Sequence, residues 1–219
     1  MTGEGETDLS PSAWEARYAS GETRWDRGMP APPFVDLLAS GAAPPPGRLA
    51  VLGCGRGHDA LLFARHGFRV TGFDFAPSAI RTARALAAVA GLDARFEERD
   101  IFTLPGEHAG AFDAVLEYTC FCAIVPARRA DYVRAVDGLL APGGFLVALF
   151  YPFEKTGTGP DAPDGGPPFL VTDADVAALF GERFSIRSVT VPARSIESRR
   201  GREKLVILEK RPAAGDARK

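Results

Sequence analysis

Three glycines alternate after an apolar run in the stretch VLGCGRGHD, namely Gly53, Gly55 and Gly57. Glycines at a strand-to-helix turn let the backbone approach a ligand closely, although they can also serve the turn alone. Asp74 ends the next apolar run, where an acid can hold the hydroxyls of a ribose. Asp59, at the start of the intervening helix, would repel a pyrophosphate. The charges therefore favour a phosphate-free, cationic adenosine compound such as S-adenosylmethionine.

Two more strand ends carry residues that could contact such a ligand. Asp100 and Ile101 follow the third apolar run and could contact the edge and face of an adenine, while Glu117 and Tyr118 end the fourth. Open α/β sheets bind ligands at the carboxyl ends of their strands. Each residue alone would be ordinary strand-end polarity, but together with Asp74 they predict one crevice.

Three aromatic residues, Trp14, Tyr18 and Trp25, stand before the first strand. Residues four apart share one helix face, so Trp14 and Tyr18 belong together. Such a set is often part of a core. The alternative is a lid whose rings face a sulfonium cation, a contact that contributes about 0.5–2 kcal/mol.

Arg128 and Arg129 open a predicted helix, where cations oppose the helix dipole. Because local conflicts of this kind often mark functional sites, we assign Arg129 to the acceptor side and Arg128 to the surface. Cys120 and Cys122 could form a reactive pair, but they fit small buried apolar positions better. His58 could touch the glycine loop, but the histidines lie beside no acid–nucleophile pattern. The cysteines form no CxxC pair, and no metal site is predicted.

The elements that must position these residues follow an alternating pattern. The first five predicted strands alternate with helices and should pair in parallel. The last two strands have no helix between them and should pair antiparallel. This predicts an α/β fold with a seven-stranded sheet, mostly parallel with an antiparallel C-terminal hairpin, and helices on both faces, as is typical of class I methyltransferases. The predicted strands are 48–53, 68–74, 94–100, 112–118, 144–151, 184–193 and 203–211, and the predicted helices are 58–67, 77–91, 126–144 and 173–180.

Length and composition predict one domain over residues 1–219. Residues 1–10 and 212–219 are expected to be flexible tails, 11–45 a cofactor lid and 154–169 a possible acceptor lid. The net charge of −2 gives no electrostatic footprint for nucleic acid or an anionic membrane. No apolar run approaches the roughly 18 residues of a membrane span. We therefore expect a cytoplasmic monomer that acts on a small molecule.

Several segments together resemble the thiopurine S-methyltransferase superfamily, most closely its plant-type halide and thiol methyltransferase branch. They lie in family order over residues 14 to 210, and the N-terminal aromatic set and CFCAI are more specific than the glycine loop. The segments are WEARYASGETRWDRG (14–28), GCGRGHD (53–59), GFDFAPSAI (72–80), DIF (100–102), EYTCFCAIVPARR (117–129), YP (151–152), GPPF (166–169) and RRGREKL (199–205).

The resemblance implies S-adenosyl-L-methionine as the methyl donor and a small, soft nucleophile as the acceptor. It implies that Arg129 lies near the acceptor, and Tyr151 matches the tyrosine of the branch's YP motif. Tyr18 stands where the plant branch commonly has tryptophan, and EYTCFC replaces a plant-like DYVFFC. The positions it implies for the cofactor are Trp14, Tyr18, Trp25, Gly53, Asp74, Asp100, Ile101 and Tyr118, to which the glycine loop adds Gly55.

The predicted reaction is an in-line displacement at the methyl carbon by a thiolate, sulfide, thiopurine or halide. Such a nucleophile needs no strong base, in agreement with a sequence in which no general base stands out. An O- or N-methyltransferase of the same fold is the first alternative. A nicotinamide oxidoreductase and a non-catalytic binding module are the others.

Overall fold

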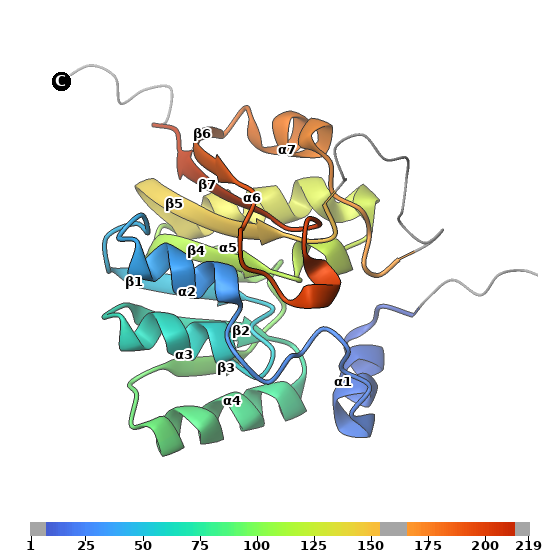
Figure 1. Cartoon of the computed structure of the whole chain (residues 1–219). Coiled ribbons are helices and arrows are strands. Elements are labelled where there is room, and N and C mark those ends of the chain that lie inside the picture. Colours follow the sequence, from blue (N-terminus) through green and yellow to red (C-terminus); the bar gives the residue numbers. More distant parts are fainter. Residues whose placement is uncertain (1–7, 154–165, 213–219) are drawn as a thin grey trace, which may run out of the picture.

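The computed structural model describes residues 8–153 and 166–212, which form a seven-stranded sheet with helices on both faces (Figure 1). The strand order is β3-β2-β1-β4-β5-β7-β6. β1 to β5 are parallel, and β7 is antiparallel to both β5 and β6. The strands are β1 (Arg48–Leu52), β2 (Arg69–Asp74), β3 (Arg95–Glu98), β4 (Phe112–Tyr118), β5 (Leu140–Phe150), β6 (Phe184–Thr190) and β7 (Lys204–Lys210).

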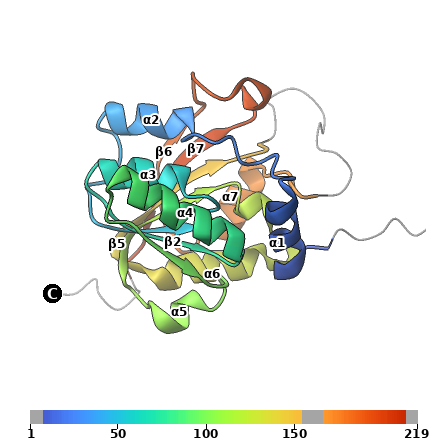
Figure 2. The same ribbon diagram turned by 90° about the horizontal axis from the view of Figure 1, so that it is seen from below.

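The helices divide between the two faces of the sheet, as Figure 2 shows. One core cluster joins the sheet to α2 (Pro32–Ala39), α3 (His58–Arg65) and α4 (Pro77–Ala90). A second joins it to α5 (Leu104–Glu107), α6 (Arg129–Leu139) and α7 (Asp173–Phe180). α1 (Pro11–Ser20) lies apart from both layers and contacts α4.

The helix boundaries follow from local chemistry. Ser10 caps α1 by accepting a hydrogen bond from the Ala13 N–H at 3.2 Å, and Gly21 ends that helix in the left-handed region. Pro77 opens α4, where its missing N–H costs nothing, and Gly91 ends it. Ser10 and Gly21 thus set the bounds of α1, and Pro77 and Gly91 set those of α4.

The predicted boundary between helix 126–144 and strand 144–151 is wrong. The stretch APGG at 141–144 was expected to end a helix before a strand at 144–151, but α6 ends at Leu139 and β5 begins at Leu140. Leu140 pairs with Phe112, and a register shift follows before Phe145 pairs with Ala114. A β-bulge accommodates such an irregular stretch, so Gly143, with its positive φ, lies inside the strand.

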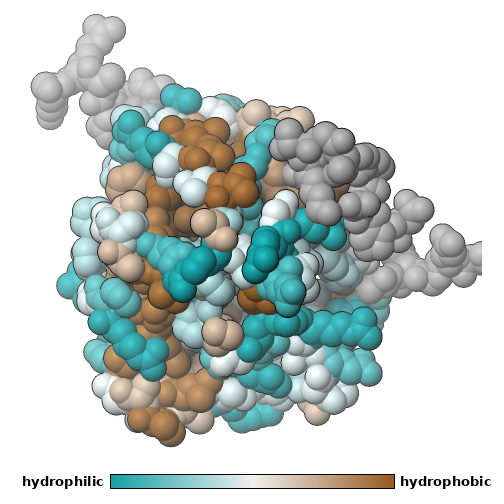
Figure 3. Space-filling model, in the orientation of Figure 1, coloured by the Kyte–Doolittle hydropathy of each residue, from teal (hydrophilic) through white to brown (hydrophobic). Residues whose placement is uncertain are grey.

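β6 is an edge strand and carries apolar side chains on the surface. Ile186, Val189 and Val191 are exposed, and Figure 3 shows apolar residues gathered over this part of the molecule. The register of β6 against β7 shifts between Ile186 and Ser188, and Arg187 pairs with Glu209. A bulge and a charge both discourage further strand pairing at such an edge.

Candidate active site

The glycine loop connects β1 to α3 at the carboxyl end of the sheet. Gly53 and Gly55 have φ angles of +56° and +52°, which favour glycine. A Cβ atom at Gly53 would lie 2.8 Å from the Cys120 sulfur, and one at Gly55 would lie 2.8 Å from the Tyr18 hydroxyl. Both positions therefore require glycine for conformation and for space.

Asp74 closes β2 and ties the loop to the strand end. One carboxylate oxygen accepts a hydrogen bond from the Gly55 N–H at 2.9 Å, and the other accepts one from Ala76 at 2.9 Å. Burial raises the pKa of this carboxyl, while the backbone hydrogen bonds oppose the rise. Each carboxylate oxygen has two lone pairs, so Asp74 can still accept bonds from a ligand hydroxyl.

The three N-terminal aromatic residues meet beside this loop. The rings of Trp14 and Trp25 are 5.1 Å apart, and those of Tyr18 and Trp25 are 5.5 Å apart, each pair edge to face. The Trp25 indole N–H donates a hydrogen bond to the Tyr18 hydroxyl at 3.0 Å. We call residues 11–31 the aromatic lid. α2, the other helix of the predicted lid 11–45, belongs to the core, since Phe34 is fully buried.

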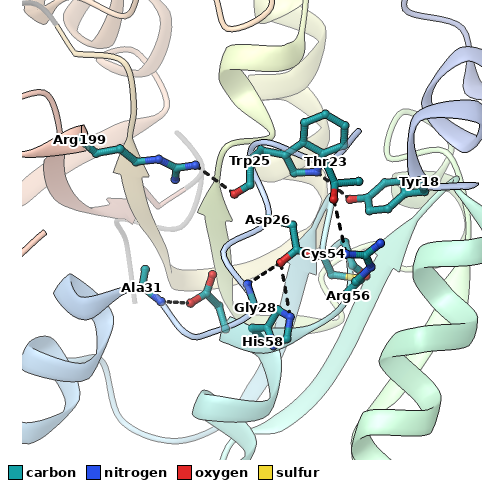
Figure 4. A network of polar contacts seen from close by, with 12 residues as sticks. Tyr18, Thr23, Trp25, Asp26, Gly28, Ala31, Cys54, Arg56, His58 and Arg199 are labelled. Carbon is teal, nitrogen blue, oxygen red and sulfur yellow. Dashed lines mark hydrogen bonds and ion pairs between the residues drawn. The ribbon is translucent and has the colours of Figure 1, made fainter. Parts of the chain in front are cut away.

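Polar contacts hold the aromatic lid against the glycine loop (Figure 4). Asp26 lies at the centre, 2.8 Å from Arg56 and 3.4 Å from His58, and accepts a hydrogen bond from the Gly28 N–H. Burial alone would raise the pKa of Asp26, but the bonds from His58 and Gly28 and the charges of His58 and Arg56 lower it to about 2. Asp26 is therefore a carboxylate at neutral pH.

Two further contacts attach the aromatic lid at its ends. The Ser78 N–H donates a hydrogen bond to Glu15 at 3.0 Å, which joins α1 to the start of α4. The Ala31 N–H donates one to Asp59 at 2.7 Å, which joins the last lid residue to α3. The aromatic lid is thus attached along its length by side chains from other elements.

A pocket of about 630 Å³, part of it open to solvent, lies between the aromatic lid and the carboxyl ends of β1 and β4. It contains several of the predicted cofactor residues. Its lining residues are Tyr18, Trp25, Asp26, Arg27, Met29, Ala31, Val51, Leu52, Gly53, Cys54, Gly55, Arg56, Gly57, His58, Asp59, Leu116, Tyr118, Thr119 and Ile196.

Tyr118 belongs to a buried polar cluster that sequence reasoning missed. Its hydroxyl donates a hydrogen bond to Glu203 at 2.5 Å and accepts one from Arg199. Arg199 also donates to the Trp25 carbonyl at 3.0 Å, and its guanidinium lies 4.7 Å from the centre of the Tyr151 ring. Arg199 and Glu203 are 4% and 2% exposed, so they are structural parts of this site and not surface charges.

Arg129 does not line the pocket. It is 3% exposed and donates hydrogen bonds to the carbonyls of Phe169 and Leu170 at 3.2 and 2.9 Å. Its guanidinium lies 4.7 Å from the Phe121 ring and 3.6 Å from Asp175. In this conformation Arg129 fixes the described end of the predicted acceptor lid, 166–169; residues 154–165 lie outside the described part of the chain.

Asp100 and Ile101 follow β3 beyond the pocket. Asp100 is exposed and accepts a hydrogen bond from the Phe102 N–H at 3.0 Å, and Ile101 is buried in the core. They lie at the same edge of the sheet as Asp74, since β3 pairs in parallel with β2. Their assignment to the adenine stays a prediction.

Glu117 points into the core, away from the pocket. It is 1% exposed and accepts hydrogen bonds from the Phe121 N–H and the Tyr132 hydroxyl. Burial raises its pKa to about 8, although the bonds from Phe121 and Tyr132 oppose the rise. Glu117 thus holds the turn after β4, in which Thr119 has a φ angle of 59°.

Arg199 and Glu203 could be picked out in the sequence, but no role could be assigned to them. Both belong to the segment RRGREKL, which contributes to the resemblance. Their partner Tyr118 is on β4. The segment RRGREKL lies near Tyr118 because β7, which begins at the end of the segment, pairs with β5, the neighbour of β4. Asp26 likewise belongs to the segment RWDRG, in which only Trp25 was predicted to contact the cofactor.

The fold is shared with methyltransferases of known structure. A protein solved in a study titled "Conversion of a Disulfide Bond into a Thioacetal Group during Echinomycin Biosynthesis" matches with a TM-score of 0.75 and 26% identity, over 92% of this chain and 93% of that one. The 1,6-didemethyltoxoflavin-N1-methyltransferase of Burkholderia thailandensis, with bound S-adenosylhomocysteine, matches with a TM-score of 0.70 and 24% identity, over 94% of this chain and 88% of that one. The fold is that of a class I methyltransferase.

The sequence relatives narrow the class. The thiopurine S-methyltransferase family matches residues 9–212. Thiocyanate methyltransferase 1 of Brassica oleracea is 36% identical, over 90% of this chain and 84% of that protein. Probable thiol methyltransferase 2 of Arabidopsis thaliana is 32% identical, over 91% of this chain and 85% of that protein. The chain belongs to the thiopurine S-methyltransferase family and is a methyltransferase of its plant-type branch.

Within 8–153 and 166–212, no helix has the length and apolar character needed to cross a membrane. Among these same residues, no group of histidine, cysteine and acidic side chains is arranged to hold a metal ion.

Proposed function

We propose that this enzyme transfers the methyl group of S-adenosylmethionine to a small thiol, or to another soft nucleophile such as sulfide, a thiopurine or a halide. The observation that carries the proposal is the aromatic lid, which lies over a glycine loop joined to Asp74. Relatives named as thiol and thiocyanate methyltransferases support the class of acceptor.

The residues present fit the cofactor. Gly53 and Gly55 leave backbone that a side chain would cover, and Asp74 has lone pairs for ribose hydroxyls. Trp25 and Tyr18 line the pocket with aromatic rings, which attract a cation. The cofactor, when bound, would supply a methyl group on a positively charged sulfur.

The chain's own contribution would be alignment and the exclusion of water. The aromatic lid covers the pocket, and a shielded pocket removes the hydration shell of an anionic nucleophile. Charge is neutralised when that anion attacks a sulfonium, so a dry and oriented site favours the reaction. Glu117, the acid with the pKa best suited to a base, is turned into the core and bonded to Tyr132.

The test is turnover of labelled S-adenosylmethionine with a panel of acceptors. Label should be transferred to one or more soft nucleophiles in the panel, which contains sulfide, methanethiol, a thiopurine, thiocyanate and iodide. Phenols and amines should gain no label. S-Adenosylhomocysteine should raise the Tm and NADH should not. Labelled phenol or amine products alone would overturn the acceptor class, and stabilisation by NADH alone would favour an oxidoreductase.

A further inference from the structure

The pocket extends away from the positions predicted for adenosine. Gly53, Tyr118 and Asp59 are among the described residues that line it, and Asp74 and Asp100 are not. A cofactor whose ribose lies on Asp74 would therefore place its amino-acid end in this pocket. That end carries an ammonium and a carboxylate, and each needs a partner when it leaves water.

The two acids of the pocket differ in how fully they are bonded. Asp26 receives bonds from Gly28 and His58 on one oxygen and from Arg56 on the other, so its charge is already paired with a guanidinium. Asp59 accepts the Ala31 N–H at 2.7 Å on one oxygen, and among the described residues no other hydrogen bond reaches its side chain. Asp59 therefore has a carboxylate oxygen free beside the pocket.

The surroundings of Asp59 favour a cationic partner. Burial raises the pKa of Asp59 to about 6; the Ala31 N–H and the charges of His58 and Arg199 oppose this rise, and Glu203 adds to it. A partly desolvated carboxylate is stabilised by a donor that carries positive charge. The sulfonium has no N–H to donate, whereas the ammonium has three.

We propose that Asp59 binds the α-ammonium group of the cofactor, with the Ala31 N–H holding the carboxylate in place. This rests on the proposed function, because it assigns one end of the same cofactor. Closure of the aromatic lid and binding of the amino-acid end are then linked, since Ala31 is the last residue of the lid. Arg27 and Arg56 line the same pocket and would supply positive charge for the ligand's carboxylate.

The test compares two ligands by calorimetry, S-adenosylhomocysteine and its desamino analogue. The variant Asp59→Asn keeps an oxygen for the Ala31 N–H but loses the charge. It should bind S-adenosylhomocysteine about ten- to a hundred-fold more weakly, the loss expected for a hydrogen bond between charged groups. It should bind the desamino analogue as the wild type does. Asp93→Asn, an exposed change beyond α4, is the matched control and should alter neither affinity.

Each other outcome is informative. Equal weakening of both ligands by Asp59→Asn would mean that Asp59 only shapes the loop, and unchanged affinity for S-adenosylhomocysteine would also overturn the inference. If the variant does not fold, the wild type still tests the inference: removal of the ammonium should weaken its ligand about ten- to a hundred-fold, and equal binding of the two ligands would overturn the inference. A wild-type protein that binds neither ligand would refute the proposed function itself.

Discussion

At the scale of single residues, Asp74 has two tasks, since it anchors the glycine loop and would hold the ribose. Asp74→Ala should weaken S-adenosylhomocysteine binding by about 1.5–3 kcal/mol, or about ten- to a hundred-fold, because ligand hydroxyls lose a charged acceptor. Calorimetry would measure this, with the exposed Asp93→Ala as control. Unchanged affinity in a folded Asp74→Ala protein would remove Asp74 from the site.

Glu117 predicts how stability depends on pH. Its pKa is raised to about 8 in the folded protein, against about 4.3 in an unfolded chain, so the folded state holds the proton more tightly. The contribution is therefore fully present below pH 4 and is lost as the pH rises through 8, at up to about 1.4 kcal/mol per pH unit. Arg129 opposes this shift by its charge, and burial dominates it.

Glu117→Gln removes this titration while leaving an acceptor for the Phe121 N–H. The free energy of unfolding, measured in urea from pH 5 to 8, should fall less steeply for the variant than for the wild type. The exposed Glu182→Gln should follow the wild type. Parallel curves for all three proteins would show that Glu117 does not titrate in this window.

Sequence reasoning succeeded for residues whose partners are close in the chain or at neighbouring strand ends. Trp14, Tyr18 and Trp25 meet because one helix and one turn carry them. It failed to give Arg199 a role, because its contact with Tyr118 depends on the packing of segments far apart in sequence. Arg129 was placed near the acceptor by resemblance, and its bonds to Phe169 and Leu170 could not be deduced from its position at a helix start.

At the scale of elements, the aromatic lid should be separable from the core. Trp25→Ala should weaken S-adenosylhomocysteine binding while lowering the Tm by less than about 5 °C, because Trp25 packs on Trp14 and on a small cluster at the start of α4, apart from the two main core clusters. Phe34→Ala, in α2, provides the contrast, since a fully buried phenylalanine lost from a core costs about 3–5 kcal/mol. Loss of folding in Trp25→Ala would show that Trp25 is a core residue.

The element pattern itself was largely readable from the sequence. Alternating apolar runs and helices gave the parallel strands, and the confirmed hairpin of β6 and β7 followed from the missing helix between them. The start of β5 was not readable. The glycines after Leu140 look like a helix end, and only pairing with β4 draws this stretch into the sheet.

At the scale of the whole molecule, the proposed reaction predicts a pH profile that belongs to the acceptor. A free thiol ionises near pH 8.5, so kcat/KM should rise about tenfold per pH unit and level off near the acceptor's own pKa. A more acidic thiol should level off earlier, and iodide, if turned over, should show no rise. An inflection common to all acceptors would indicate a base on the enzyme and contradict this mechanism.

The place of β7 in the sheet has a consequence for synthesis. β6 is made before β7, yet among the described strands β6 pairs with β7 alone, which lies between it and β5. On the ribosome, β6 therefore emerges without a partner, and the open edge of β5 stays unpaired until β7 follows. Arg199 and Glu203 lie between β6 and β7 in the sequence. The hydrogen bonds of Tyr118 with Glu203 and of the Trp25 carbonyl with Arg199 therefore also form late. A nascent chain stalled before β7 would have most of its parallel sheet but would lack the contacts of Arg199 and Glu203 with Tyr118.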